Sequence, residues 1–565
     1  MFGIKKKKCY STIIGTFCGV ISFLVLYGVG SLNVQNDAWI MQGYDGSDIV
    51  QHYAGWVNFR EAPWKLPLGE MNNLGTTGSL VSYTDSIPIV AILFKLFRDF
   101  LPATFQYFGI YILLCFILQG IGAALLLERK KVSLIIQTGC VLLFTFSPVM
   151  IERAFRHTAL ASHFLILFSM LHYLNYRESL KQKEKGNLPG GLILQNCLAI
   201  MIHPYFLPIT MMFTLLAIIE FLRIKHWKGV GNWSRGIFEA GKCGFPVLIL
   251  GNLIGVLGSG ISPSRYGYGF FSMNLNAPFN PLSCGAYTWS TLLPVLPQRN
   301  GNYDGFNYFG AGILGLFMFV LIAALLNRYI LADFAKRNAF VFIAILFMTG
   351  FAITNVITVN QWQIVIPMPD WLITLCGIFR ASSRMFYFTW YVVLTGALYF
   401  LIGLIRNART IVVIILVFVC LQGVDLSKLV IQKHEMMNEN VAAESILTDM
   451  ELAQMLEGHT LIVTAPELDG EDCRKLAVLS GKNGMKITAY ISPVKFPEKT
   501  IETEREYILL FEEKQFLKEC IYTTSDTKQY NEWHALYPNT EIMKFYEGDG
   551  IYFAVPVISR GISDA

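Results

Sequence analysis

The sequence predicts a polytopic α-helical membrane protein of about 11 transmembrane helices with a C-terminal extracytoplasmic α/β domain. Hydrophobic residues make up 54% of the 565 residues, and the mean hydropathy is +0.47. Charged residues make up only 15%, whereas soluble domains carry about 25%. Apolar runs long enough to cross a bilayer recur as far as residue 424, and residues 425–565 lack them.

Eleven apolar runs come close to the roughly 20 residues that a helix needs to cross the hydrocarbon core. Between the fifth and sixth runs, the stretch "HPYFLP" contains Pro204 and Pro208, which predict a turn or a break in the helix. The predicted spans are 11–32, 102–127, 132–150, 158–176, 188–203, 205–222, 243–260, 309–326, 339–357, 385–405 and 410–424.

Lys and Arg residues predict the orientation of these spans. The N-terminal segment and the even-numbered connections hold 21 of them, and the longer odd-numbered connections hold ten. Because short cytoplasmic segments are enriched in Lys and Arg, the N-terminus is predicted in the cytoplasm and the C-terminal part outside. The basic connections are 128–131, 177–185, 223–242, 327–337 and 406–409.

Three external loops are expected to carry function, because long loops beside rigid helices often do. They are the first loop, 33–100, and the loops 261–308 and 358–384. Within the first loop, "SIPIVAILFKLFRDF" (86–100) is apolar but contains two basic residues and one aspartate. This pattern predicts an amphipathic helix lying in the outer membrane interface, with a re-entrant helix as the alternative.

The tail, residues 425–565, differs from the rest in charge and pattern. It holds 14 Lys and Arg against 24 Asp and Glu, whereas residues 1–424 hold 31 against 16. Short strands are predicted at "TLIVTA" (460–465), "MKITAYI" (485–491), "YILLF" (507–511) and "IYFAVPV" (551–557), with a charged helix at "EDCRKLAVLSG". The tail contains no Gly-rich phosphate loop, and the whole chain has no CxxC pair that would indicate zinc. Cys473 and Cys520 could pair in an extracytoplasmic tail.

The first candidate site is "YDGSDIVQHYAGW" (44–56), which gathers Asp45, Asp48, His52, Tyr53 and Trp56 just beyond the first span. The aromatic rings suit stacking on a sugar, but they equally suit the aromatic belt of a membrane interface. The two carboxylates suit acid–base chemistry, but Asp48 could equally cap a short helix. Further along the same loop, "SYTDSIP" adds Asp85.

A second group, in "IERAFRHTALASHF" (151–164), contains Arg153, Arg156, His157 and His163. Ionisable residues at membrane depth are costly and are usually paired or functional. Snorkelling to the interface would explain the arginines, but it explains His163 poorly because that residue lies inside an apolar run.

A third group, in "FRASSRMFYF", places Arg380 and Arg384 four residues apart, which on a helix would give them a common face. Two guanidinium groups on one face suit a phosphate, and pairing with a carboxylate such as Asp370 is the alternative. A fourth group, Asn276 and Asp304 among the Gly- and Tyr-rich segments 265–281 and 300–312, has the composition of a carbohydrate-facing loop.

These stretches resemble the GT-C superfamily of membrane glycosyltransferases, which includes protein mannosyltransferases, the aminoarabinose transferase and oligosaccharyltransferase. The resemblance is closest to a bacterial family of that clan without an assigned function. It covers about residues 40–390 and leaves out the tail. It is carried by "DIVQHYAGWVNFR", "PWKLPLG", "YTDSIP", "FQYFGIYILLCFILQG", "NLNAPFNP", "DGFNYFGAG" and "FRASSRMFYF".

The resemblance implies a GT-C-like catalytic module over 1–424, with the soluble domain at 425–565. It implies an inverting transfer of a sugar from a polyprenyl-phosphate donor to an extracytoplasmic glycan, lipid or protein. An acidic residue of the first loop would be the general base: Asp48, or alternatively Asp45. Arg380, Arg384 and Arg153 would bind the donor phosphate, and the lipid tail would lie in a groove between helices. The expected sugar and acceptor pocket comprises His52, Tyr53, Trp56, Asp85, His157, His163, Asn276 and Asp304.

No cofactor or metal site is firmly implied, although a pyrophosphate donor would favour Mg²⁺ or Mn²⁺ at Asp45 and Asp48. The expected partners are the lipid bilayer of the bacterial plasma membrane, the lipid-linked donor and the cell-envelope acceptor, with no nucleic acid. Two alternative functions fit the sequence as well. One is a flippase or transporter of lipid-linked saccharides, which would be expected to place ionisable groups near the bilayer midplane. The other is a non-catalytic envelope assembly protein.

Overall fold

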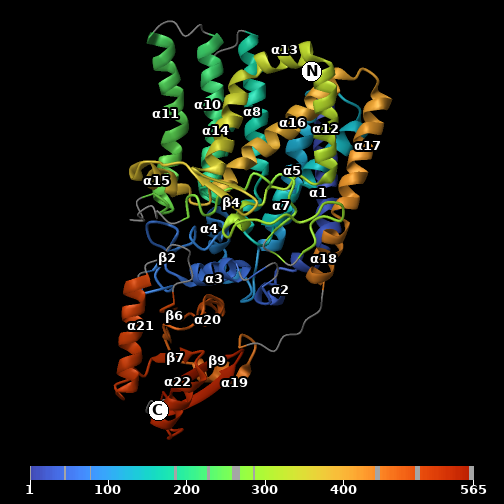
Figure 1. Cartoon of the computed structure of the whole chain (residues 1–565). Helices are drawn as coiled ribbons and strands as arrows, with labels where there is room; N and C mark the ends of the chain where they lie inside the picture. Colours follow the sequence, from blue (N-terminus) through green and yellow to red (C-terminus); the bar gives the residue numbers. More distant parts are fainter. Residues whose placement is uncertain are drawn as a thin grey trace. The chain divides into compact units, whose positions relative to one another are not determined.

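The structure, a computed structural model, describes residues 2–43, 46, 48–76, 78–182, 187–224, 230–257, 267–283, 285, 287–438, 446–489 and 497–558 (Figure 1). The chain divides into two compact units. The helical unit consists of residues 1–33, 107–250 and 260–439. The loop–tail unit consists of residues 34–106, 251–259 and 440–565. The first external loop and the C-terminal tail therefore belong to one unit.

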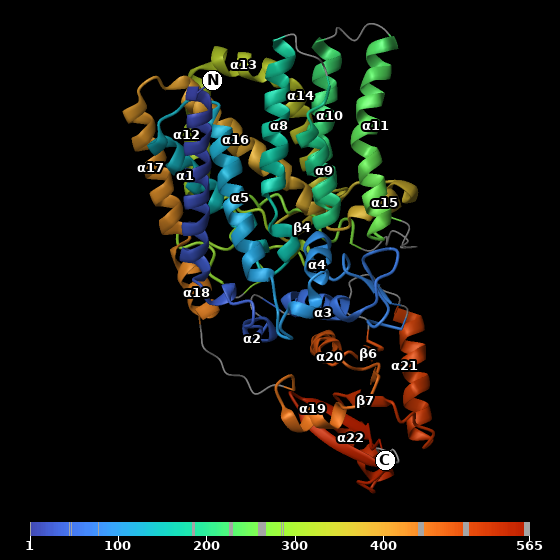
Figure 2. The same ribbon diagram turned by 180° about the vertical axis from the view of Figure 1, so that it is seen from behind.

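The helical unit contains a bundle in which α1, α5, α8 and α10 lie side by side (Figure 1, Figure 2). Its α-helices are α1 (Phe2–Tyr27), α5 (Phe108–Glu128), α6 (Leu134–Thr145), α7 (Pro148–Arg153), α8 (Phe164–Lys181), α9 (Gly190–Ile202), α10 (Phe206–Ile224), α11 (Val230–Leu253, as far as residue 250), α12 (Ala311–Leu326), α13 (Arg328–Arg337), α14 (Ala339–Ile353), α15 (Asp370–Cys376), α16 (Phe386–Leu404), α17 (Ala408–Asp425) and α18 (Ser427–Asn438).

Five helical segments in the described part of the chain are long and apolar enough to cross a membrane. A sixth is obtained if α12 and α13, which meet at a bend of 106°, count as one span. These lengths and compositions agree with the prediction of a membrane protein. Each of the eleven predicted spans overlaps a helix, although α6, α9 and α14 are shorter than a full span. The five segments are Cys9–Tyr27, Phe108–Glu128, Phe206–Ile224, Ser382–Leu404 and Ala408–Asp425.

Two of the differences between the predicted and observed helical boundaries have a local explanation. The run 132–150 is divided into α6 and α7, because Pro148 lacks an amide hydrogen and therefore begins a new helix instead of continuing the old one. Helix α11 begins at Val230, so much of the connection predicted at 223–242 is helical. Its apolar character starts only in the later turns, which is why the pattern indicated a shorter helix.

Glycines allow α1 and α5 to pack closely. A Cβ atom on Gly15 would lie 2.5 Å from the Cα of Ile121, and one on Gly120 would lie 2.1 Å from the carbonyl oxygen of Gly15. Gly15 and Gly19 form a GxxxG pattern, and small residues at this spacing let helix backbones approach one another in membranes.

The loops of the helical unit carry a two-stranded antiparallel sheet of β3 (Val356–Val359) and β4 (Trp362–Val365). They also carry short 3₁₀ turns. These are η1 (Gly30–Leu32), η3 (Thr158–Ala161), η4 (Asn302–Gly305), η5 (Gly377–Phe379) and η6 (Ser382–Met385).

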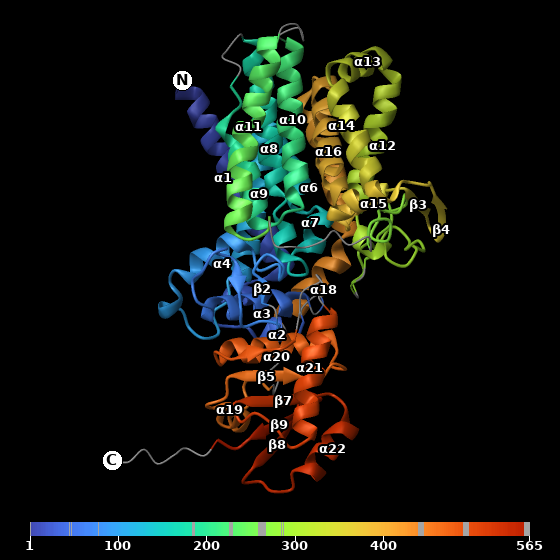
Figure 3. The same ribbon diagram turned by 90° about the vertical axis from the view of Figure 1, so that its left-hand side faces the viewer.

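The loop–tail unit combines short helices of the first loop with a five-stranded sheet of the tail (Figure 3). From the first loop come α2 (Ala38–Met41), α3 (Asp48–Glu61), β1 (Glu70–Met71), β2 (Ser79–Leu80), α4 (Pro88–Lys95) and η2 (Arg98–Phe100). From the tail come α19 (Met450–Leu456), β5 (Leu461–Thr464), α20 (Gly470–Lys482), β6 (Lys486–Ile487), α21 (Pro497–Glu512), β7 (Cys520–Thr524), α22 (Thr527–Leu536), β8 (Met543–Gly548) and β9 (Ile551–Pro556).

The strand order of the tail sheet is β6-β5-β7-β9-β8. Strands β6, β5 and β7 are parallel to one another, β9 runs antiparallel to β7, and β8 runs antiparallel to β9. Asp549 and Gly550, both at positive φ, form the turn between β8 and β9, which suits a tight hairpin. The predicted strands at 460–465, 485–491 and 551–557 each contain a strand, although residues 490 and 491 lie outside the described part.

The strand predicted at "YILLF" is wrong, because residues 507–511 form part of α21. A short apolar run fits a buried helix face as well as a strand, and periodicity alone does not separate them. Within this helix, Ile508 and Phe511 are buried three residues apart, which is helical spacing. Cys473 and Cys520 are both free thiols.

Helix α3 of the first loop packs against α20 of the tail. The Asn58 side chain donates a hydrogen bond of 2.7 Å to the carbonyl oxygen of Ala477. A Cβ atom on Gly481 would lie 2.7 Å from Cγ2 of Val57, so only glycine lets the two helices approach this closely. The tail therefore holds the helix on which Asp48 lies.

Helix α4 and the turn after it expose an apolar stripe, formed by Leu93, Leu96, Phe97 and Phe100. These residues follow the i, i+3, i+4, i+7 spacing of one helix face. On the opposite side, the buried Lys95 ammonium lies 3.9 Å from the centre of the Phe59 ring, and burial lowers its pKa to about 8. An exposed stripe of this kind is what the predicted interface helix requires.

A buried carboxyl group in the tail gives a testable pH dependence. Oε1 of Glu504 on α21 accepts hydrogen bonds from the hydroxyls of Thr464 (2.5 Å) and Thr488 (3.2 Å). Burial raises the pKa of Glu504, and the two hydrogen bonds only partly offset this effect. Because the pKa is raised on folding, the stabilising contribution is complete below the ordinary value and is lost as pH rises through the folded value.

We therefore expect Glu504→Gln to raise the melting temperature at pH 7, because Gln keeps a hydrogen-bond acceptor without an ionisation penalty. The difference from the wild type should shrink at pH 4, where Glu504 is protonated. Thermal unfolding of the full chain in detergent between pH 4 and 8 measures this. Glu506→Gln, an exposed position on the same helix, is the control. A lower melting temperature for Glu504→Gln at pH 7 would contradict the expectation.

Candidate functional site

Three charged side chains from distant parts of the sequence meet in the helical unit. Nη1 of Arg153 lies 3.0 Å from Oδ1 of Asp304, and Nη2 of Arg384 lies 3.2 Å from the same oxygen. Nη2 of Arg153 also donates a 2.7 Å hydrogen bond to the backbone carbonyl of Asp304. All three side chains are buried or nearly so. They belong to three of the groups that the sequence singles out.

Local structure sets the positions of these residues. Arg153 is the last residue of the short helix α7, and Arg384 lies in η6 at the start of the α16 segment. Asp304 lies in η4, which follows Gly301 at a φ of 94°. A Cβ atom on Gly301 would lie 2.6 Å from the carbonyl oxygen of Phe270, so this turn requires glycine.

Further charges surround Arg153. Its Nε lies 3.0 Å from Oε2 of the buried Glu152 and donates a 2.8 Å hydrogen bond to the Tyr387 hydroxyl. Nη1 of Arg156 lies 3.1 Å from Oε1 of Glu152. We call Glu152, Arg153, Arg156, Asp304 and Arg384 the arginine cluster. Its three guanidinium groups and two carboxylates leave a net charge of +1.

Aromatic side chains complete the surroundings of the cluster. The Arg384 guanidinium lies 4.7 Å from the centre of the Tyr205 ring, a cation–π distance. The ring of His163 lies 4.6 Å from that of Tyr387, and its Nδ1 lies 2.8 Å from the Tyr391 hydroxyl. His163 is thus packed among tyrosines, and in this structure it has a partner within the helix bundle.

The electrostatics of the cluster favour anions. Burial raises the pKa of Asp304, but the guanidinium groups of Arg384 and Arg153 outweigh burial and hold the pKa below its ordinary value. Asp304 is therefore a carboxylate at neutral pH. Nε of Arg384 is buried and has no hydrogen-bond partner within the described residues. A buried N–H donor without a partner, in a cluster of net positive charge, suits a phosphate oxygen as its acceptor.

The predicted common helical face of Arg380 and Arg384 is wrong. Between η5 and η6, Ala381 has a non-helical conformation, and its amide donates to the Tyr205 hydroxyl at 3.0 Å instead of to a helix carbonyl. Arg384 pairs with a carboxylate, as the alternative interpretation expects, but the partner is Asp304 and not Asp370. Arg380 is half-buried, and its guanidinium lies 5.9 Å from the Phe271 ring.

Two further predicted residues belong to the helical unit. His157 lies near the arginine cluster, and Asn276 contacts other residues. Nε2 of His157 lies 3.9 Å from Oδ1 of Asp304. Asn276 does not face this group. Its amide donates to the carbonyl oxygen of Pro297 at 3.1 Å and to Oδ1 of Asn360 at 2.8 Å, so it holds loops together.

The predicted residues of the first loop lie in the loop–tail unit. Asp48 is the first residue of α3, and its Oδ1 lies 3.3 Å from Nη2 of Arg474. Nε2 of the buried His52 lies 3.8 Å from Oδ2 of Asp85, and these two side chains are of metal-ligand type. Asp45 lies outside the described residues.

Tyr53 and Trp56, which are predicted to belong to the sugar and acceptor pocket, are fully buried. The Tyr53 hydroxyl donates to Oδ2 of Asp37 at 2.8 Å, and the Trp56 indole donates to the carbonyl oxygen of Phe105 at 2.9 Å. Nζ of Lys482 lies 2.6 Å from the same Asp37 oxygen. These bonds connect α3 to the segments that contain Asp37 and Phe105, and Asp37 in turn binds Lys482 of α20.

Several residues of these arrangements were missed in the sequence, among them Glu152, Tyr205, Tyr387, Asp37 and Arg474. Glu152 stands directly before Arg153 in the sequence. Because a buried arginine needs a carboxylate, this neighbour indicates a partner for Arg153. Arg474 lies more than 400 positions after Asp48, and the sequence contains no signal for that pair.

The arginine cluster and Asp48 all lie within one stretch that matches a known family. No curated protein matches the sequence significantly. The model of a family described as a domain of unknown function, DUF6311, matches residues 16–427, and because this stretch is most of the chain, the protein belongs to that family.

Proposed function

We propose that this protein is an inverting membrane glycosyltransferase of the GT-C type. It would move a sugar from a polyprenyl-phosphate donor to an extracytoplasmic glycan, lipid or protein of the cell envelope. The observation that carries the proposal is the arginine cluster, which concentrates buried guanidinium groups at the start of the long apolar segment Ser382–Leu404. The resemblance of its sequence motifs to those of GT-C enzymes also supports it.

In this proposal the cluster binds the donor phosphate. Arg384 supplies the unpartnered Nε, and Arg153 fixes the position of Asp304, which in turn orients Arg384. As the bond between the sugar and the phosphate breaks, negative charge grows on the leaving phosphate. Preoriented guanidinium groups stabilise that charge without rearrangement.

Asp48 is the proposed general base. It takes the proton of the acceptor hydroxyl while the acceptor oxygen attacks the anomeric carbon, and polyprenyl phosphate leaves with the electron pair of the broken bond. Its Oδ1 lies 3.3 Å from Nη2 of Arg474, and it is the first residue of α3.

The topology belongs to the same proposal. All eleven predicted runs cross the plasma membrane, with the N-terminus in the cytoplasm and the tail outside. Helices too short to cross alone, such as α6 and α9, would cross together with neighbouring segments. The arginine cluster and the first loop then face the outer side, where lipid-linked sugars are used by envelope enzymes.

Binding of a C55 polyprenyl phosphate tests the phosphate site without knowledge of the sugar. Arg384→Gln should weaken binding to the purified protein about 10- to 100-fold, because a hydrogen bond to a charged group contributes about 1.5–3 kcal/mol. Native mass spectrometry in detergent measures this binding. Arg235→Gln, at an exposed position on α11, is the control. Unchanged binding by a folded Arg384→Gln protein would refute the phosphate site.

A further inference from the structure

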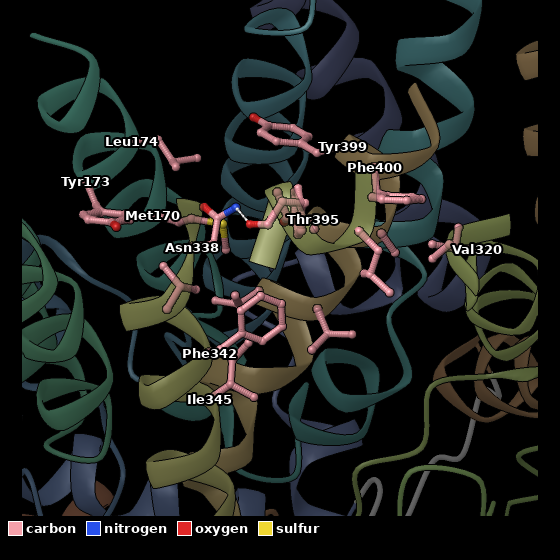
Figure 4. Close-up of a pocket in the computed structure, with 18 of the residues that line it drawn as sticks. Met170, Tyr173, Leu174, Val320, Asn338, Phe342, Ile345, Thr395, Tyr399 and Phe400 are labelled. Atoms are coloured by element: carbon pink, nitrogen blue, oxygen red, sulfur yellow. Dashed lines mark hydrogen bonds between the residues drawn. The ribbon is translucent and has the colours of Figure 1, made fainter. Parts of the chain in front are cut away.

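The helical unit contains an apolar cavity of about 480 Å³ between α8, α10, α12, α13, α14 and α16 (Figure 4). Nearly all of its lining is apolar, with Asn338 and Thr395 among the few polar side chains (Figure 4). Leu321 on α12 and Phe342 on α14 line it and are also exposed, so the cavity opens at the surface of the bundle. Its volume is in the range of ligand-binding pockets.

One end of the cavity is bordered by charged side chains, of which those of Arg177 and Glu220 are largely buried. Nη1 of Arg177 donates a 2.7 Å hydrogen bond to Oδ1 of Asn338, and its Nε lies 3.0 Å from Oε1 of Glu220. Arg223 pairs with Glu220 at 2.7 Å, and the exposed Arg337, whose carbonyl accepts a hydrogen bond from Arg177, pairs with Asp333. Three arginines and two carboxylates leave this end with a net charge of +1.

This end lies far along the bundle from the arginine cluster. Helix α16 carries Tyr387 beside Arg153 and lines the cavity as far as Phe400. Thirteen residues at 1.5 Å each separate these two positions by roughly 20 Å along the helix. Arg177, Arg223 and Arg337 also come from connections that the charge pattern predicts on the cytoplasmic side.

Helix α13 indicates where this end lies in the bilayer. It turns by 106° from α12 and runs across the ends of the neighbouring helices (Figure 3). Leu331 and Phe334 of this helix line the cavity, while Arg328, Lys336 and Arg337 are exposed. A short helix with one apolar face and one basic face is typical of the headgroup region.

We propose that this cavity holds an acyl chain of an anionic phospholipid of the inner leaflet, with its phosphate at the Arg177 end. The apolar lining fits a hydrocarbon chain. The net positive charge fits an anionic headgroup over a zwitterionic one. A polyprenyl-phosphate donor bound at the arginine cluster would place its phosphate at the other end of α16 from Arg177. The inference holds whether or not the protein transfers sugars.

A substitution that fills the cavity tests this inference. Gly396 lines the cavity, and a Cβ atom there would meet nothing within 4 Å. Leucine at this position should therefore occupy the space of the lipid chain without a backbone clash. Gly403 lies on the same helix, is equally open and is outside the cavity lining, so Gly403→Leu is the matched control.

The full chain is delipidated in detergent, and phosphatidylglycerol, phosphatidylcholine or a C55 polyprenyl phosphate is added. Native mass spectrometry then counts the lipids bound. Gly396→Leu should bind at least tenfold less phosphatidylglycerol than the wild type, and Gly403→Leu should bind as much as the wild type. Arg337→Gln should reduce the preference for phosphatidylglycerol over phosphatidylcholine.

Three results would overturn the proposal. One is unchanged phosphatidylglycerol binding by Gly396→Leu. Another is equal binding of both phospholipids by the wild type. The third is a loss confined to the polyprenyl phosphate, which would assign the cavity to the isoprenoid tail. Unchanged melting temperatures of the variants show that none of these results comes from misfolding.

Discussion

Asp48→Asn is expected to lower the rate of sugar transfer by about 10²- to 10⁴-fold, the usual contribution of a general base. Asn keeps the size of the side chain and remains a good residue at a helix N-terminus, so α3 should form normally. It cannot take a proton from the acceptor. Transfer from polyprenyl-phosphate sugars to an added acceptor, measured in detergent with the full chain, gives the rate.

The ion pair with Arg474 provides the control for this experiment. Asp48→Asn also breaks that pair, so part of its effect could come from a displaced α3. Arg474→Gln breaks the same pair but leaves the carboxylate, which is partly exposed, so its cost in stability is expected to be about 1 kcal/mol or less. If Arg474→Gln lowers the rate as much as Asp48→Asn does, Asp48 is a structural residue. Full transfer by Asp48→Asn would also remove it from the mechanism.

Arg153→Gln is expected to destabilise the helical unit by about 3–5 kcal/mol, the cost of breaking a buried ion pair by removal of one partner. Arg153 is only 1% exposed and lies within 3.0 Å of carboxylate oxygens of both Glu152 and Asp304. Without its guanidinium, the buried carboxylates of Glu152 and Asp304 each lose one of their two arginine partners. A reduced melting temperature and a lower denaturant midpoint of the full chain in detergent would show this.

Arg156→Gln is the matched control, because Arg156 contacts the same Glu152 but is 14% exposed. Its loss leaves Arg153 in place, so the destabilisation should be much smaller. Equal destabilisation by the two variants would show that burial does not govern the energetics of the cluster. A normal melting temperature for Arg153→Gln would contradict the prediction outright.

The arginine cluster shows which features of the site the sequence alone can predict. Arg153, His157, Asp304 and Arg384 were each singled out by their residue type in an unusual place, but as members of separate groups. Their meeting depends on the packing of α7, η4 and η6. Arg153 and Asp304 are 151 positions apart in the sequence, and Asp304 and Arg384 are 80 apart. No local pattern predicts such a pairing, and the expected helical face of Arg380 and Arg384 was wrong because the contact of Ala381 with Tyr205 replaces a helical hydrogen bond.

The presence of helices apolar enough to cross a membrane, the places of these helices and the mixed fold of the tail were determined by the sequence, because they depend on local composition and periodicity. Tertiary structure alone decided that the first loop and the tail form one unit, that "YILLF" is helical and that Asp48 faces Arg474. The reason is physical. Burial of an apolar run is a local property of a chain in a bilayer, whereas the partner of a charge depends on which distant segments pack together.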